Sequence, residues 1–101
     1  LKNTLLLQID FQKYTEAISL SKEGIEIFPS QPLLYLANGV ANIALQNSND
    51  AIDSLETGLD YILENPIMEK DYYEQLQIAY TQKGDTKNAA KYAKRAATIQ
   101  L

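Results

Sequence analysis

The stretch DAIDSLETGL, from Asp50 to Leu59, has a counterpart in EAISLSKEGI, from Glu16 to Ile25. Both begin with an acidic residue, Ala and Ile and end with Gly and an aliphatic residue, at a constant offset of 34 residues. A third copy, NAAKYAKRAA, begins at Asn88. A fixed period of about 20 to 50 residues is the signature of a repeat architecture. We therefore divide the 101 residues into three repeats, at about 1–31, 32–65 and 66–101.

Each repeat has the pattern of a helix pair. Pro32 and Pro66 suit the first turn of a helix, because proline lacks the N–H that would have no partner there. Polar or turn-forming residues mark the breaks, at 11–13, 28–32, 46–49, 64–66 and 83–85. No segment alternates with a period of two, so no strand is expected. We predict about six helices, near residues 1–10, 14–27, 32–45, 49–63, 67–82 and 86–99.

Small residues recur at equivalent places in the second helix of each repeat. Gly24 and Gly58 share one position, which Ala96 takes in the third copy. Alanine occupies another shared position in all three copies, at Ala17, Ala51 and Ala89. Glycine inside a helix costs roughly 1 kcal/mol relative to alanine. Two glycines at one position therefore predict a helix crossing too close for a side chain.

The second repeat interval is longer than the first, because 38 residues separate Tyr35 from Tyr73 and Gly58 from Ala96. The four extra residues equal about one helical turn, and they fall around YILENPIMEK, residues 61–70. We expect a helix extended by a turn on either side of Pro66. A slightly longer loop is the alternative.

The pattern resembles the tetratricopeptide repeat, whose signature of period 34 runs W-x2-L-G-x2-Y, then A-x3-F, then P. Tyr35 and Gly39 match in the second copy, while Asn38 and Asn42 depart from it. In the third copy the aromatic, Leu and Tyr positions are taken by Tyr73, Leu76 and Tyr80. The front helix of the first copy matches poorly. The resemblance covers the whole chain and implies one all-α domain, a right-handed superhelical solenoid of antiparallel helix pairs.

The resemblance also implies a binding surface, because the first helices of such repeats line a concave groove. The central first helix, PLLYLANGVANIAL at 32–45, carries no charge. The predicted partner-binding groove consists of Leu33, Leu36, Val40, Ile43, Asp71, Glu74 and Ile78. We interpret this groove as an apolar site for a hydrophobic peptide or helix of a protein partner. Alternatively, neighbouring repeats, flanking sequence or another molecule covers the stripe.

Asp71 and Glu74 form an acidic rim of the predicted groove, which disfavours a negatively charged ligand. Family members that clasp the C-terminal carboxylate of heat-shock chaperones use Lys, Asn and Arg, and only Lys2 matches that set here. Leu6, Ala37, Asp71 and Gln75 occupy the other positions. We therefore expect no carboxylate clamp of that type.

Charge is segregated along the chain. From Glu23 to Glu69 there are eight acidic residues and no Lys or Arg. Basic residues gather near the end, at Lys83, Lys87, Lys91, Lys94 and Arg95. Such runs of like charge are typical of helix faces exposed to solvent. Alternatively, they attract a charged partner or a second copy of the chain bound head to tail. The net charge of −4 argues against a nucleic-acid partner.

Neither a catalytic nor a metal-binding motif is evident. The chain has no His and no Cys, so the usual triads and zinc ligand sets cannot form. SLSK, residues 19–22, lacks the companion motifs of penicillin-recognising enzymes. We predict a non-enzymatic interaction scaffold that needs no cofactor. The alternatives are a non-catalytic, substrate-presenting region of a larger enzyme such as a glycosyltransferase, or a self-association module.

The chain ends and the longest apolar runs carry the remaining expectations. The chain opens on Leu1 without an initiating Met, so we interpret it as a piece of a longer protein whose targeting signals lie elsewhere. No apolar run is long enough to insert into a membrane, and composition predicts a soluble protein of undetermined compartment. Apolar terminal helices predict either a homodimer or stabilisation by flanking sequence, through AATIQL at 96–101 and through Leu1, Leu5, Leu6, Leu7 and Ile9.

Overall fold

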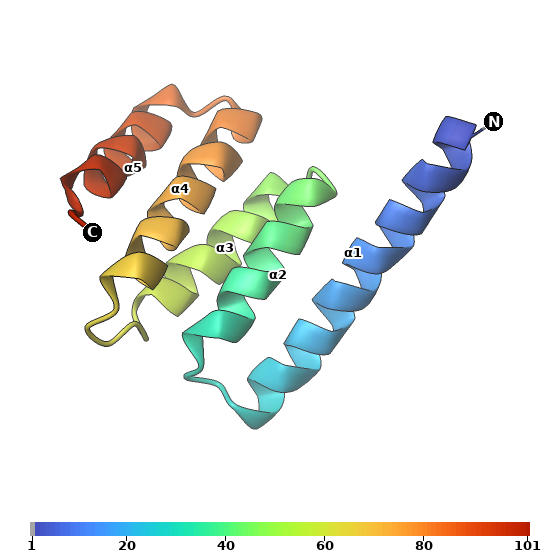
Figure 1. Ribbon diagram of the computed structural model, residues 1–101, viewed down its shortest axis with the longest axis horizontal. Coiled ribbons are helices and arrows are strands. Elements are labelled where there is room, and N and C mark those ends of the chain that lie inside the picture. Colours follow the sequence, from blue (N-terminus) through green and yellow to red (C-terminus); the bar gives the residue numbers. More distant parts are fainter. Residues whose placement is uncertain (1) are drawn as a thin grey trace.

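The computed structural model describes the backbone of residues 2–101 and the side chains of residues 10–101. Within that range it is all-helical and has no strand, as the sequence predicts. Figure 1 shows its five helices in chain order: α1 (Lys2–Ile27), α2 (Pro32–Ala44), α3 (Ser48–Leu59), α4 (Pro66–Lys83) and α5 (Thr86–Thr98). No helix of the described residues is both long enough and apolar enough to cross a membrane.

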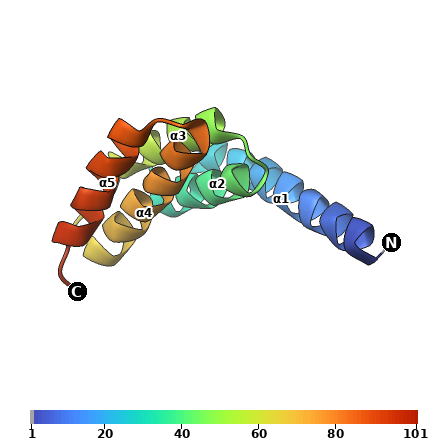
Figure 2. The same ribbon diagram turned by 90° about the horizontal axis from the view of Figure 1, so that it is seen from above.

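The first predicted helix pair is a single helix. α1 runs for 26 residues through 11–13, where a break was expected. The prediction of six helices is wrong at this place because the segment contains neither Gly nor Pro, so nothing there interrupts the backbone hydrogen bonds. Thr15 Oγ1 also donates to the Phe11 carbonyl at 2.8 Å, one turn earlier in the helix. The N-terminal half of α1 consequently extends beyond α2 (Figures 1 and 2).

The other two predicted pairs, α2–α3 and α4–α5, are joined by turns of the same construction. Asn47 N–H donates to the Asn42 carbonyl at 2.8 Å, and Asp85 N–H donates to the Tyr80 carbonyl at 2.9 Å. Both turns contain one residue of positive φ, which is Gln46 in the first (65°) and Gly84 in the second (85°). All three equivalences obey the offset of 38 residues found in the sequence.

The extra turn lies in α4. α2 and α4 both begin with proline, but α4 has 18 residues and α2 has 13. The Asn65 side chain caps α4 by accepting from Met68 N–H at 3.1 Å. The helical extension is therefore confirmed on the C-terminal side of Pro66. On the other side α3 already ends at Leu59, and a loop occupies residues 60–65.

The core lies where α2, α3 and α4 meet and continues between α4 and α5. Leu55, Tyr72 and Leu76 are its largest fully buried side chains. A Cβ on Gly58 would overlap Tyr35 and the Tyr72 hydroxyl, which confirms the close crossing predicted from the repeated glycines. At Gly24 the contact is looser, because an added Cβ would lie 3.0 Å from the flexible end of Leu34.

The helices pack mainly on their neighbours in the chain. α1 contacts α2, α2 contacts α3, α3 contacts α4 and α4 contacts α5, while α2 also contacts α4 directly. Figure 2 shows the resulting arch, with α2 and α4 on its inner side and α3 and α5 on its outer side. This arrangement decides which side chains of α2 and α4 remain uncovered.

Candidate functional site

The inner side of α2 is uncharged and apolar. On the opposite side Asn38 and Gly39 are buried against α3, where Gly39 faces Leu55 so closely that an added Cβ would overlap it. The uncovered stripe recurs at the spacing of one helix face and contains Leu33, Ala37, Val40 and Ala44. Leu33 is 57% exposed and Val40 is 40% exposed. These side chains therefore present apolar surface that no described element covers.

The inner side of α4 mixes apolar and acidic residues. Tyr72 and Leu76 face the core, and the exposed stripe on the opposite side contains Ile67, Asp71, Glu74, Ile78 and Thr81. Ile78 is 44% exposed. An open hollow of about 500 Å³ lies along this stripe, lined by Glu74, Gln77, Ile78, Thr81 and Gln82. We call the two stripes together the inner face.

The predicted groove residues divide into two groups. Leu33, Val40, Asp71, Glu74 and Ile78 are exposed on the inner face. Leu36 is half-buried and packs against the core. Ile43 is only 9% exposed and belongs to the core, and its carbonyl accepts a hydrogen bond from Gln82 Nε2 at 3.1 Å. Ile43 joins α2 to α4 and offers almost no surface to a ligand.

Sequence reasoning missed Ile67, which is 62% exposed at the start of α4. Repeat alignment makes Asp71 the first groove position of the third repeat, and Ile67 lies one turn before it in the extra turn. The four-residue insertion around residues 61–70 is the sequence signal that could have identified Ile67. Once the insertion is known to be helical, the spacing of four residues puts Ile67 on the same stripe as Asp71.

Asn38 and Asn42, which depart from the repeat pattern, lie on the same helix as the predicted groove residues of α2. Both are buried, and their side chains form a hydrogen-bonded network. Asn38 Nδ2 donates to Ser21 Oγ of α1 at 3.0 Å, and Asn38 Oδ1 accepts from Ser54 Oγ of α3 at 2.5 Å. Asn42 Nδ2 donates to Asn38 Oδ1 at 2.8 Å. The two asparagines therefore connect three helices and are not available to a ligand.

A tyrosine cluster performs the corresponding role near α5. Glu56 of α3 accepts hydrogen bonds from Tyr80 Oη at 2.8 Å and from Tyr92 Oη at 3.1 Å. The rings of these two tyrosines are stacked with centroids 5.7 Å apart. Burial and the adjacent Glu56 carboxylate raise the pKa of Tyr92 to about 12, and burial raises the pKa of Tyr80 as well. Both phenols therefore stay protonated at neutral pH and act as donors.

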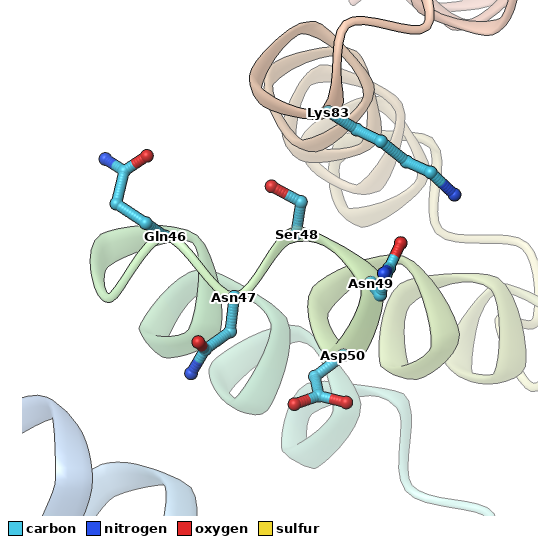
Figure 3. Close-up of a pocket in the computed structure, with 6 residues that line it drawn as sticks. All are labelled: Gln46, Asn47, Ser48, Asn49, Asp50 and Lys83. Carbon is cyan, nitrogen blue, oxygen red and sulfur yellow. The ribbon is translucent and has the colours of Figure 1, made fainter.

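A second hollow, of about 480 Å³, lies beside the turn between α2 and α3. It is lined by Gln46, Asn47, Ser48, Asn49, Asp50 and the Lys83 side chain at the end of α4. Figure 3 shows Asn47 and Asp50 pointing to one side of the backbone and Gln46 and Ser48 to the other. Asn47 Nδ2 also donates to Asn42 Oδ1 at 3.3 Å. The polar groups do not converge on one point where a ligand atom could bind.

Residues 10–101 contain no group of three or more acidic side chains arranged to hold a metal ion. Lys2, Leu6 and Ile9, together with the N-terminal leucines predicted to support a dimer, lie outside the described side chains. At the other end Leu101 is exposed. Among the described residues, the inner face is the candidate site, because its exposed side chains form continuous rows along α2 and α4.

Comparison of the chain with protein families, with curated proteins and with solved structures finds no match.

Proposed function

We propose that this chain is a tetratricopeptide-like scaffold whose inner face binds a peptide or helix of a protein partner. The observation that carries the proposal is the uncharged, exposed apolar stripe of α2 on the inner side of the arch. Exposed apolar side chains that recur along one helix face gain free energy when a partner removes them from water. A partner that lays apolar side chains across Leu33 and Val40 would obtain that gain.

Three further features support the tetratricopeptide-like part of the proposal. The helix contacts follow chain order, with one additional contact between α2 and α4, as expected for the first helices of successive repeats. The turns of α2–α3 and α4–α5 have the same hydrogen bonds. Gly39, at the Gly position of the repeat signature, lies so close to Leu55 of α3 that an added Cβ would overlap it. A right-handed superhelix is the continuation of this arrangement that the resemblance implies.

A selection of 12-residue peptides from a random displayed library tests the function. We expect selected peptides rich in aliphatic or aromatic side chains, bound by the wild-type chain and lost in Leu33→Glu and Val40→Glu. Leu20→Glu on α1 is the control, because Leu20 is even more exposed, at 66%, but lies outside the inner face. Circular dichroism checks that all three variants stay helical. Selected peptides that bind Val40→Glu as well as wild type would refute the inner face as the site.

A further inference from the structure

The inner face has its negative charge on one helix, between apolar side chains. α2 contributes no charged residue to it. On α4, Asp71 and Glu74 lie between Ile67 and Ile78, and all four are exposed. The spacings of four, three and four residues keep them on one side of the helix. A segment bound along α4 would therefore meet an apolar side chain, two carboxylates and another apolar side chain in succession.

The extra turn of α4 sets the length of this succession. Ile67 and Ile78 are eleven residues apart, which is about 17 Å along a helix. Without the inserted turn the exposed stripe would begin at Asp71, with no apolar side chain before the carboxylates. The insertion therefore converts an acidic end of the face into an acidic centre.

Basic side chains are concentrated elsewhere in the described structure. Lys91 and Arg95 lie over the Tyr92 ring, at 4.8 and 5.3 Å from its centroid, and belong to α5, a helix on the outer side of the arch. Lys83 lines the hollow beside the α2–α3 turn. Lys70 is half-buried, next to Asp71 in the chain and four residues before Glu74, so it lies at the edge of the stripe. The exposed charges of the inner face are thus the carboxylates of Asp71 and Glu74.

We propose that the partner segment of the inner face is apolar at both ends and carries Lys or Arg at its centre. Its apolar side chains lie on Ile67, Ile78 and the α2 stripe, and its central cations lie beside Asp71 and Glu74. This inference rests on the proposed function and specifies the chemistry of its partner. The apolar contacts supply most of the affinity, while the exposed carboxylates select the charge and speed the encounter.

Three synthetic 12-residue peptides test the charge preference. They share leucines at both ends and differ only in a central pair of Lys, Gln or Glu residues. In fluorescence anisotropy at low salt we expect the Lys peptide to bind about tenfold more tightly than the Glu peptide, with the Gln peptide between them. Raising the salt concentration should narrow the difference, since exposed charges are screened.

The double variant Asp71→Asn/Glu74→Gln should bring the Lys and Glu peptides to equal affinity. Asp50→Asn/Asp53→Asn on α3 removes the same net charge from the outer side and should leave the preference intact. Ile67→Ser should weaken all three peptides about threefold, unlike Leu20→Ser. A preference that survives Asp71→Asn/Glu74→Gln, or equal binding of the three peptides to wild type, would overturn the inference. If the three peptides bind the wild type equally and Val40→Glu abolishes that binding, the proposed function stands and only the charge preference is refuted. If Val40→Glu binds the peptides as well as the wild type does, both the proposed function and this inference are refuted.

Discussion

The helix pairs α2–α3 and α4–α5 share one backbone design and differ in what fills it. Their turns have equivalent hydrogen bonds, and their residues correspond at an offset of 38. Where the first pair has Asn38, Asn42 and Ser54, the second has Leu76, Tyr80 and Tyr92. At these positions the first pair therefore has a buried polar network, and the second has an apolar and aromatic interior.

The interior of each pair also forms hydrogen bonds with a helix outside that pair. α1 supplies Ser21, whose hydroxyl accepts from Asn38, so the polar network fixes α1 on α2. α3 supplies Glu56, whose carboxylate accepts from Tyr80 and Tyr92, so the aromatic interior fixes α5 and α4 on α3. The described residues leave no buried side-chain nitrogen or oxygen without a partner. A helix pair can therefore exchange its core chemistry when all its buried polar groups remain paired.

Transferring the polar residue into the apolar pair should have the largest effect. Leu76→Asn removes a fully buried side chain and puts an amide where the surrounding contacts are apolar. We expect the free energy of unfolding to fall by about 4 kcal/mol. Urea unfolding followed by circular dichroism measures it. Leu76→Met is the control and should cost less than about 1.5 kcal/mol; a loss that small in Leu76→Asn would mean that the site can hydrate.

The reverse transfer should cost less. Asn38→Leu leaves the Ser54 hydroxyl and the Asn42 amide short of a partner, and we expect a loss of about 2 kcal/mol in the same measurement. A double-mutant cycle of Asn38→Ala with Ser54→Ala should give a coupling of about 1 kcal/mol. Strictly additive effects in the cycle would contradict the network.

The tyrosine cluster should make stability sensitive to alkaline pH. The pKa of Tyr92 is raised to about 12 in the folded chain, above its ordinary value of 10.0. The stability that protonated Tyr92 adds to the folded chain is therefore fully present below about pH 10 and is lost as the pH rises toward 12. Tyr92→Phe should flatten this part of the stability profile and cost about 1 kcal/mol at pH 7 through the lost hydrogen bond to Glu56. Glu56→Gln removes the adjacent negative charge and lowers the pKa of Tyr92 in the folded chain, so the alkaline loss of stability should be smaller and end at a lower pH. An unchanged profile in both variants would refute the assignment.

Exchanging the turn residues should have the smallest effect. Gln46 adopts positive φ where the second pair has Gly84, and a residue with a Cβ is strained there. We expect Gln46→Gly to stabilise the chain by about 0.5 kcal/mol, after the entropy cost of glycine, and to raise the melting temperature by about 3 °C. Gly84→Gln should destabilise it. A melting temperature that falls in Gln46→Gly would show that the Gln46 side chain has a stabilising contact.

Sequence reasoning located the helices of the second and third repeats because prolines, the glycine turn and the spacing of small residues act locally. It failed at residues 11–13 because a repeat boundary was expected where the chain contains no helix breaker. Of the predicted groove residues, Leu33, Val40 and Ile78 are exposed on the inner face, whereas Ile43 is buried. Periodicity reports the direction of a side chain around its own helix, whereas the burial of Ile43 depends on how closely α4 approaches α2.

The helical class, the repeat period and the four-residue insertion follow from the sequence alone, because helix propensity, capping and periodicity are properties of neighbouring residues. Tertiary packing was needed to make Asn38 and Asn42 internal connectors and to bury Ile43. Those outcomes depend on contacts between residues distant in the chain, such as Ser21 with Asn38 and Asn38 with Ser54. A polar side chain is buried when another helix completes its hydrogen bonds, and packing decides whether it does.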